Sequence, residues 1–572
     1  MKIHPDRKFL PVDFKLNSAA DVVPYFEQLL EASLSDRASL EHWLVLRNEL
    51  ECVVAEDLGW RYINMTCHTE NEDFQKSYAY FIENIQPQLA QYADQLNRKI
   101  LSCEAVGKVE NLPGYQLMIR NLRKEVEIYR EENIPLFTEI NSLSQKYAQR
   151  SAAMTIDHNG TEITLQQAAV LLLENDRSLR EQVWRKITQR RLEDASELDQ
   201  IFSAMVRLRH QVAVNAGFEN FRDYMFKAMG RFDYTPKDCF DFHQSIEEYV
   251  VPKLNDLAKE RKSRLGLNDL RPWDKAVDPS GLPPLKAFEG GDDLTNKSIE
   301  CFQRLDPFLG QCLSTMKEMG HLDLVSRKGK APGGYNYPLA ETGIPFIFMN
   351  ATSTLRDLTT IMHEGGHAVH NFLTKDLLLN DFKSPPMEVA ELASMSMELI
   401  SMDQWNIFFN NPGDLVRAKT EQLEDILETL PWVATIDAFQ HWIYENPNHS
   451  SEERAKKWRE ILNRFSDVYT DWSGLEEAKD FLWHKQLHLF EVPFYYIEYG
   501  MAQLGAIAIW RNYKTNPAKG LQGYFDALKL GYMTAIPEIY SAAGISFDFS
   551  GNYIRELTEF TGRELDKAAT IN

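Results

Sequence analysis

The chain has 572 residues, 44% of them hydrophobic and 26% charged, so it can bury large apolar cores and is neither a disordered chain nor a disulfide miniprotein. Its 62 basic and 84 acidic residues give a formal net charge of −22. This charge repels phosphate backbones and anionic lipid headgroups, so we expect no nucleic-acid partner and no membrane partner. The six cysteines include no C-x-x-C pair, and neither a leader-like segment nor a run of 18 apolar residues is visible. We therefore expect a cytoplasmic protein with reduced thiols.

Helical periodicity dominates the first part of the chain. Between Ala19 and about Arg150, apolar side chains recur at steps of three and four residues, with arginine and glutamate between them. Met118, Leu122 and Val126 are an example of this spacing. The pattern predicts a series of long amphipathic helices.

A β-hairpin is predicted after these helices. Residues 154–158 and 161–164 alternate in character and flank Asn159-Gly160, a pair that tolerates the positive φ angles of a tight type I′ turn. We expect a domain boundary beside the hairpin. It divides the chain into an N-terminal helical lobe, residues 1–164, and a second domain, residues 165–572.

Helices resume after the hairpin and extend to about Arg264. Residues 266–293 are rich in Pro, Gly and Asp, which predicts a long irregular connection. Short β signals follow at residues 333–337 and 345–350, and helical periodicity then continues almost to the C-terminus. These patterns predict a mostly α-helical fold with a small β element directly before a helix.

The motif His363-Glu364-Gly365-Gly366-His367 follows this β element. Residues four apart lie on one face of a helix, so the imidazoles of His363 and His367 can reach one ion, and zinc accepts neutral imidazole. Glu364 points to the side of this face, where it can accept a proton from a water at the metal. The alternative is a chance match of the pattern on a surface helix.

The sequence around the motif favours a buried helix. Thr354 followed by Asp357 forms a capping box at its start, and Leu, Met and Val give it an apolar stripe. Gly365 and Gly366 each cost roughly 1 kcal/mol relative to alanine inside a helix, so we expect a substrate or a neighbouring helix to approach closely there. His370 lies on the same face as His363, and a polar partner explains it better than a metal-binding role.

An acidic cluster supplies candidates for a third metal ligand. Glu388, Glu391 and Glu398 project from one face of a helix that we expect to start at Ser384-Pro385, and their neighbours are mostly Ala, Met, Leu and Val. Buried carboxylates need partners, which a metal ion and its histidines would supply. The alternative is a solvated acidic face. Geometry alone does not choose between Glu388 and Glu391.

The third element is a group of histidines and tyrosines, His484, His488, Tyr495, Tyr496 and Tyr499. His484 and His488 are four residues apart and form a weaker candidate for a second metal pair. Tyrosine clusters are usually part of a core or an interface, but beside a zinc site Tyr O–H and His N–H groups are the neutral donors that an oxyanion needs. Pro493 disfavours one continuous helix through the segment.

Taken in order, these motifs resemble the oligoendopeptidase F and thimet oligopeptidase family of zinc metallopeptidases. The matching features are H-E-x-x-H, a glutamate 24 residues after the second histidine within E-L-A-S-x-x-x-E, and H-L-F-E-V-P-F-Y-Y-I-E-Y near the C-terminus. The segment from Gly333 to Asn350 is similar too. The resemblance covers roughly residues 160–560, whereas only the helical character agrees in residues 1–150. It implies a two-lobed, mostly α-helical fold with a deep central channel.

The resemblance implies a role for each matching residue. His363, His367 and Glu391 are the ligands of one zinc ion per chain, and Glu364 is the general base. Glu398 matches the acidic residue that follows the ligand glutamate, and we expect it to accept a hydrogen bond from a ligand histidine. Family members often carry a bulkier residue where Gly365 stands, which implies a roomier site or a looser helix.

Two further groups of residues are implied to meet the substrate. His488 and Tyr499 match residues that contact the transition state, and Tyr496 is our choice for a second tyrosine, although Tyr495 fits as well. The β segment before the helix is expected to hold the peptide backbone as an added strand. Its residues are Gly333, Gly334, Phe346, Ile347 and Phe348.

Together these expectations describe a zinc endopeptidase that hydrolyses internal bonds of short peptides. One alternative is a non-peptidase zinc hydrolase on the same helical scaffold. The other is a catalytically inactive peptide-binding protein, but every residue that the chemistry needs is present. No pattern in the sequence predicts an oligomeric state.

Overall fold

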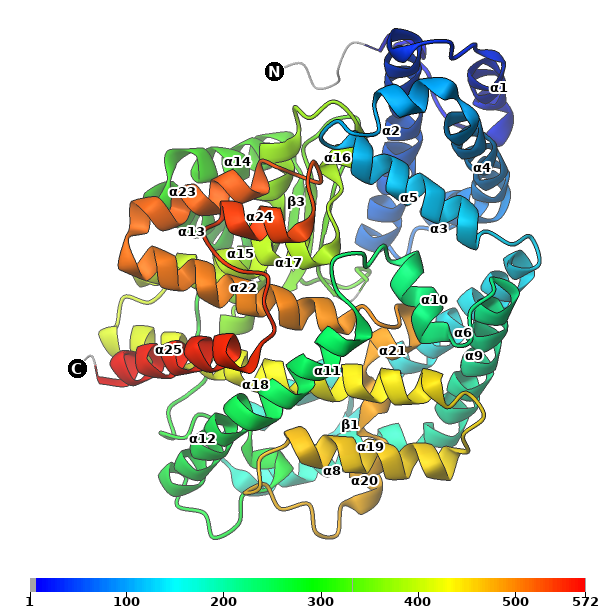
Figure 1. The fold of residues 1–572 in the computed structure, drawn as a ribbon. Coiled ribbons are helices and arrows are strands. Elements are labelled where there is room, and N and C mark those ends of the chain that lie inside the picture. The colour runs from blue at the N-terminus through cyan, green and yellow to red at the C-terminus, as the bar shows by residue number, and fades with distance from the viewer. Residues whose placement is uncertain (1–6, 332, 571–572) are drawn as a thin grey trace. The chain divides into compact units, whose positions relative to one another are not determined.

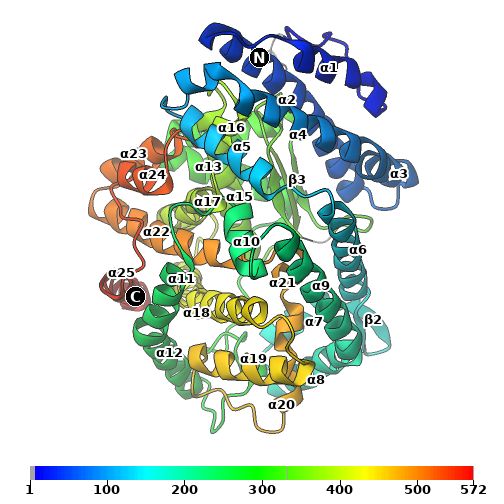
Figure 2. The same ribbon diagram turned by 45° about the vertical axis from the view of Figure 1, so that its right-hand side comes forward.

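The computed structural model describes residues 7–331 and 333–570 and is predominantly α-helical (Figures 1 and 2). About 70% of it is helix, with a few short strands, which confirms the predicted fold class. Within the described ranges, no helix is both long enough and apolar enough to cross a membrane. The six cysteines all lie in these ranges, and they are thiols, as expected.

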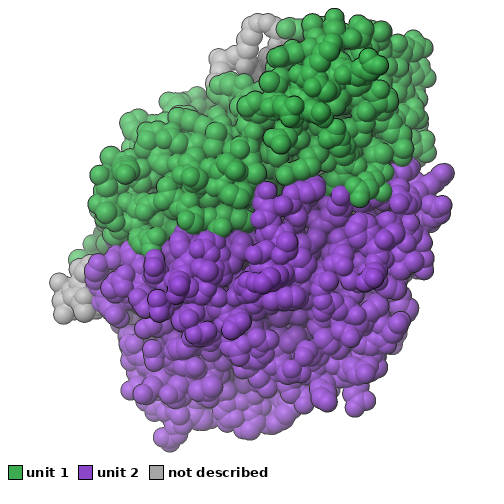
Figure 3. Space-filling view, viewed as in Figure 1, with its two compact units in different colours: residues 1–127, 286–415, 505–547 green, residues 128–285, 416–504, 548–572 purple. Residues whose placement is uncertain are grey.

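The chain forms two compact units, each assembled from three separate segments (Figure 3). Unit 1 contains residues 1–127, 286–415 and 505–547, and unit 2 contains residues 128–285, 416–504 and 548–572. These limits differ from the expected division at residue 164. The difference arises because residues far apart in the chain share one core: Leu379 and Phe382 belong to the same hydrophobic cluster as the helices of residues 10–122.

Unit 1 contains the N-terminal helices, the helices around the H-E-x-x-H motif and two helices near the C-terminus. Their bounds are α1 (Val23–Glu31), α2 (Arg37–Cys67), α3 (Glu72–Tyr80), α4 (Gln86–Ser102), α5 (Tyr115–Ile128), α13 (Gly290–Leu305), α14 (Pro307–Met319), α15 (Leu355–Thr374), α16 (Asn380–Lys383), α17 (Met387–Ser401), α23 (Pro517–Leu528) and α24 (Ile536–Ala542).

Unit 2 contains the remaining helices of the chain. They are α6 (Asn133–Ala152), α7 (Leu165–Val170), α8 (Arg177–Glu193), α9 (Ala195–Asn215), α10 (Phe221–Ala228), α11 (Pro236–Ser245), α12 (Val251–Arg264), α18 (Pro412–Glu445), α19 (Ser451–Phe465), α20 (Glu476–Asp480), α21 (Leu487–Glu491) and α25 (Gly551–Thr570). Helix α22 (Tyr496–Thr515) contains residues of both units, and the first four residues of α18 and the last residue of α5 likewise fall in the other unit.

The predicted hairpin is present in unit 2. Strands β1 (Thr155–His158) and β2 (Thr161–Thr164) pair antiparallel, with His158 opposite Thr161. Asn159 and Gly160 have φ angles of 55° and 80°, as a type I′ turn requires. The expected irregular connection is also present: a single short 3₁₀ turn interrupts the stretch between α12 and α13.

A three-stranded sheet in unit 1 precedes the motif helix. Strand β5 (Phe346–Ala351) is its middle strand, with β3 (Leu322–Val325) parallel on one side and β4 (Tyr335–Tyr337) antiparallel on the other. Strand β3 was not predicted from the sequence. The sheet packs on α2 through a small core that includes Ile63 and Phe348.

This strand order corrects one prediction about the substrate. Phe346, Ile347 and Phe348 lie on β5, whose two edges are already paired and whose side chains are buried. A peptide cannot add to a strand that has neighbours on both sides, because its backbone N–H and C=O groups are already hydrogen-bonded. The edge available next to Gly333 and Gly334 is therefore β4.

Candidate active site

Helix α15 begins where the sequence predicts it. The Thr354 hydroxyl accepts a hydrogen bond from the Asp357 backbone N–H at 3.2 Å, and the Asp357 carboxylate accepts one from the Thr354 N–H at 2.9 Å. This reciprocal capping box satisfies backbone donors that the first helical turn leaves without partners. It sets where the helix begins, and His363 and His367, four residues apart, share one face of the helix about two turns later.

Glu391 of α17 lies against these two histidines. Its Oε2 atom is 3.2 Å from Nε2 of His363 and 3.6 Å from Nε2 of His367. One nitrogen of each histidine and one Glu391 oxygen lie within 4.8 Å of one another. Three donor atoms from two helices thus converge on one point.

Close packing of α15 on α17 brings these donors together. A Cβ atom added to Gly366 would lie 2.6 Å from the carbonyl oxygen of Ala393 and 2.6 Å from Cα of Ser394. Neither contact can be relieved by a side-chain rotation, because both are with the backbone of α17. The sequence predicted that a substrate or a helix approaches the glycine pair closely, and at Gly366 the neighbouring helix α17 does so.

Gly365 has a different neighbour. A Cβ atom at this position would lie 2.6 Å from Cζ of Phe302, a residue of α13. The space that a bulkier residue would fill is therefore occupied by an aromatic ring, which argues against the roomier site inferred from the sequence. Gly365 is buried and remains within a regular helix.

Hydrogen bonds orient the donors. Nδ1 of His363 is 2.7 Å from Oε1 of Glu398, so that the ring donates its Nδ1–H to the carboxylate and directs Nε2 toward Glu391 and His367. The Ser394 hydroxyl donates to Oε2 of Glu391 at 3.0 Å. Burial lowers the pKa of His367 to about 4, which favours the neutral imidazole that a metal requires.

Burial opposes a charge on His363 as well, but its hydrogen bonds to Glu391 and Glu398 raise its pKa well above the usual value. In the absence of a metal, a proton on this ring therefore takes the place of a cation between the two carboxylates.

Glu364 lies beside the three donors and is 93% buried. Burial raises the pKa of its carboxyl group to about 7, and the negative charge of Glu391 adds to this effect. The amide of Asn336, on the edge strand β4, donates to the Glu364 backbone carbonyl at 3.3 Å. This contact ties the strand to the helix at the position of the candidate base.

Two residues left open by the sequence lie outside this donor group. Glu388 is buried on α17 but is absent from the cluster of possible ligands, and His370 is absent too. Burial lowers the pKa of His370 to about 3, and the ring is a neutral core histidine. The ring forms a hydrogen bond with the backbone of Leu528, which is the kind of polar partner expected from the sequence; among the described residues, its Nε2 atom has no hydrogen-bond partner.

The donor set fits zinc. Two imidazole nitrogens and one carboxylate oxygen are the three protein ligands of one class of catalytic zinc site, which leaves one position for water or substrate. The Nδ1–H contact from His363 to Glu398 is the outer hydrogen bond that metal-binding histidines usually make. A calcium or magnesium site would use oxygen ligands instead.

The predicted histidine and tyrosine group lies in unit 2. The ring of His488 is 5.8 Å from that of Tyr495, 4.9 Å from that of Tyr496 and 5.8 Å from that of Tyr499, measured between centroids. The amide of Gln486 donates to Nδ1 of His488 at 2.8 Å, so the proton of the neutral ring lies on Nε2. Both Tyr495 and Tyr496 belong to the cluster.

A bend at Pro493 produces this cluster. Helix α21 ends at Glu491 and α22 begins at Tyr496, as the proline predicts. Phe494, between the two helices, has a φ of 67°. Its backbone N–H donates a hydrogen bond to the side-chain oxygen of Gln440 at 2.6 Å. The turn directs tyrosines of α22 toward His488.

His484 does not form a metal pair with His488. The two residues lie on different short helices, because a 3₁₀ turn of residues 482–485 ends before α21 begins, and the i, i+4 relation therefore does not hold. Burial lowers the pKa of His484 to about 3. The cluster of possible ligands includes neither residue within the part of the chain that the structure describes.

Comparison with known proteins matches the chain to one family. The model of peptidase family M3 matches residues 170–278 and 311–559, and the model of the peptidase M3 N-terminal domain matches residues 9–129. The chain belongs to peptidase family M3. It is therefore related to peptidases, and a metal cofactor is a property of this family.

Individual members of family M3 resemble the chain to different extents. An oligoendopeptidase F homolog of Lactococcus lactis is 22% identical over 59% of the chain and 55% of its own length, so the match spans about half of that relative. An oligoendopeptidase F homolog of Borreliella burgdorferi is 21% identical over 79% of the chain and 73% of its own length. The solved structure of PZ peptidase A with an inhibitor has a TM-score of 0.89 and 25% identity, and covers 98% of this chain and 99% of that one.

Some residues of this candidate site were missed from the sequence. Ser394, which supports Glu391, lies three residues after it and could have been found from helical spacing. Asn336 and Phe302 come from a distant strand and a distant helix, and no local pattern connects either residue to the motif.

Proposed function

We propose that this protein is a zinc-dependent oligoendopeptidase, which hydrolyses internal bonds of short peptides. The observation that carries the proposal is the convergence of His363, His367 and Glu391 with Glu364 buried beside them. The names of the M3 relatives, oligoendopeptidase F homologs, support the substrate class. The six thiols outside disulfides support a cytoplasmic location.

In this proposal His363, His367 and Glu391 hold zinc, with Glu398 and Ser394 orienting His363 and Glu391. When bound, zinc supplies Lewis acidity, which acidifies water and polarises a carbonyl group. Glu364 accepts the proton that the attacking water loses and returns it to the leaving amine. Burial raises the pKa of the Glu364 carboxyl group, which favours its holding the proton between the two steps.

We propose that the edge strand β4 binds the peptide backbone. Its inner edge pairs with β5 through Tyr335 and Tyr337, which leaves its outer edge as the candidate for strand addition. Gly333 and Gly334 precede this strand. The contact from Asn336 to the Glu364 carbonyl supports the assignment, because it fixes β4 to the helix that carries the base.

His488 and Tyr499 are proposed as neutral donors to the oxyanion of the tetrahedral intermediate, and Tyr496 as a further contact. The neutral His488 ring, with Gln486 bound at Nδ1, presents Nε2–H as a donor. The clustering of these rings supports a shared role.

Metal removal tests the proposal. A peptide blocked at both ends, incubated with the protein, should be cleaved at an internal bond that mass spectrometry identifies, and a chelator should abolish cleavage. Adding zinc back should restore it, because the site loses its Lewis acid with the metal. Undiminished cleavage by protein shown to be metal-free would contradict a zinc peptidase. Absence of cleavage by zinc-loaded protein would instead favour a different hydrolase or a binding protein.

A further inference from the structure

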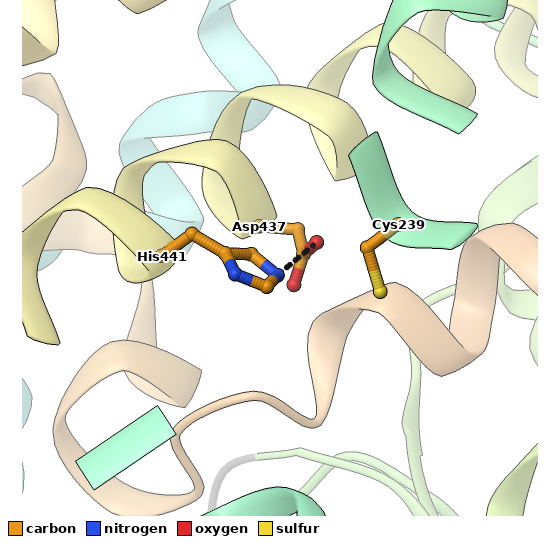
Figure 4. A group of neighbouring side chains, drawn as sticks. All are labelled: Cys239, Asp437 and His441. Atoms are coloured by element: carbon orange, nitrogen blue, oxygen red, sulfur yellow. Dashed lines mark ion pairs between the residues drawn. The ribbon is translucent and has the colours of Figure 1, made fainter. Parts of the chain in front are cut away.

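A second group of metal-binding side chains lies in unit 2, at a contact between α11 and α18 (Figure 4). Cys239 and His243 are four residues apart on α11, and Asp437 and His441 are four residues apart on α18. Each helix therefore presents two donor side chains on one face. None of these residues has a role in the proposed peptidase chemistry.

The group has the dimensions of a metal site. One donor atom each of Cys239, Asp437 and His441 lies within 4.8 Å of the other two. In a tetrahedral zinc site with ligand bonds of about 2.0–2.3 Å, the donor atoms are about 3.3–3.8 Å apart, so the three donors would have to draw together by up to about 1.5 Å, and a fourth position would remain for another ligand. Figure 4 shows the imidazole of His441, the carboxylate of Asp437 and the Cys239 sulfur facing one another.

Burial makes this arrangement costly without a ligand. Cys239 and Asp437 are 0% exposed and His441 is 2% exposed. Among the described residues, neither Oδ1 of Asp437 nor either ring nitrogen of His441 has a hydrogen-bond partner. The 3.3 Å approach of His441 Nε2 to Asp437 Oδ2 is an ion-pair contact that lacks hydrogen-bond geometry. A buried polar group left without a partner costs about 1–3 kcal/mol.

The surroundings of His441 are largely aromatic. The rings of Phe226, Phe240 and Phe494 contact that of His441, with centroids 6.0, 4.8 and 5.4 Å away. His243 provides one specific partner, since its Nε2 is 2.9 Å from Oδ2 of Asp437. This contact leaves Oδ1 and the His441 nitrogens to a different ligand.

We propose that Cys239, Asp437 and His441 bind a zinc ion that joins α11 to α18, with His243 as a positioning residue that holds the Asp437 carboxylate. A thiolate, a carboxylate and a neutral imidazole around Zn²⁺ have zero net charge, which suits an aromatic environment. The mixture of sulfur, nitrogen and oxygen donors favours zinc over calcium or magnesium. Binding releases the Cys239 proton, since the thiolate is the ligand.

Cobalt substitution tests this site separately from the peptidase site. Protein produced in cobalt-supplemented minimal medium should show the near-ultraviolet charge-transfer band of a thiolate bound to Co²⁺. His363, His367 and Glu391 include no sulfur, so a band of this kind reports a cysteine ligand. The band should disappear in Cys239→Ser and persist in Cys312→Ser, a matched buried cysteine on α14. It should also persist in His367→Ala, which removes a proposed ligand of the peptidase site.

Zinc content of protein grown with zinc gives the second measurement. The wild type should contain two zinc ions per chain, and Cys239→Ser and His441→Ala one each. His243→Ala should keep the site but weaken it roughly 10–100-fold, as loss of an outer hydrogen bond does. A wild-type cobalt protein without the thiolate band would overturn the proposal, whether or not any variant folds. A band that persists in folded Cys239→Ser protein, checked by circular dichroism, would overturn the assignment of Cys239.

Discussion

Glu388 and Glu391 are both buried carboxylates on α17, but they differ by nearly a full turn in their position along the helix. Of the two, Glu391 approaches Nε2 of both motif histidines, at 3.2 and 3.6 Å. Glu391 is therefore a candidate ligand, whereas Glu388, three residues earlier on the same helix, lies outside the donor group.

Alanine variants at these two positions test this assignment. Glu391→Ala should lose one zinc ion per chain and all peptide hydrolysis, because two histidines alone bind zinc poorly. Glu388→Ala should keep that ion and serves as the matched control. Zinc measured by mass spectrometry in both proteins checks the prediction. If Glu388→Ala lost this zinc ion and Glu391→Ala kept it, the ligand would be Glu388 and the assignment of Glu391 would be wrong.

The role proposed for Tyr499 depends on one hydroxyl group. Tyr499→Phe removes this donor and keeps the ring contacts with His488 and Tyr496. We expect kcat to fall by about 10²–10³-fold with little change in KM, because an oxyanion donor acts mainly in the transition state. Steady-state kinetics and zinc content measure the effect. A kcat near that of the wild type would show that the Tyr499 hydroxyl is not an oxyanion donor and that the tyrosines only contribute to packing.

At the scale of elements, the packing of α15 on α17 controls the donor geometry. Gly366→Ala would force the helices apart, because its Cβ meets the Ala393 carbonyl and Ser394 Cα at 2.6 Å. Overpacking of this kind costs typically about 1–3 kcal/mol. We expect lower thermal stability, weaker zinc binding and reduced hydrolysis, since Glu391 moves with α17.

Gly365→Ala is the control for this variant. Its new Cβ would meet the tip of the Phe302 ring, a side chain that can move without shifting a backbone. Zinc affinity and melting temperature should therefore change less than in Gly366→Ala. Equal losses in the two variants would show that helix separation is not the cause.

Local patterns predicted the elements whose determinants are close in sequence. The Thr354 capping box, the Asn159-Gly160 turn and the bend at Pro493 each depend on a few neighbouring residues. Strand β3 escaped prediction because it has only four residues, including Asp323, and is specified by parallel pairing with β5. The middle position of β5 depends on the same pairing, and this is why the predicted substrate strand was wrong.

At the scale of the whole molecule, the chain returns twice to each unit. Contacts such as that of the Glu56 carboxylate with the backbone of Thr342 join residues 286 positions apart, and helical periodicity shows which face of a helix is buried but not which segment covers it. The candidate metal ligands could be predicted from the sequence because their spacing follows the periodicity of two helices. The division into units depends on long-range packing and was not predictable from local pattern.

We propose Glu364 as the base at a zinc site that its neighbours form. The most direct measurement is peptide hydrolysis and zinc content in the same preparation of Glu364→Gln. The amide keeps the size of the side chain but cannot accept the proton, so we predict unchanged zinc and a loss of about 10²–10⁴-fold in kcat. Hydrolysis at the wild-type rate with unchanged zinc would show that Glu364 is not the base.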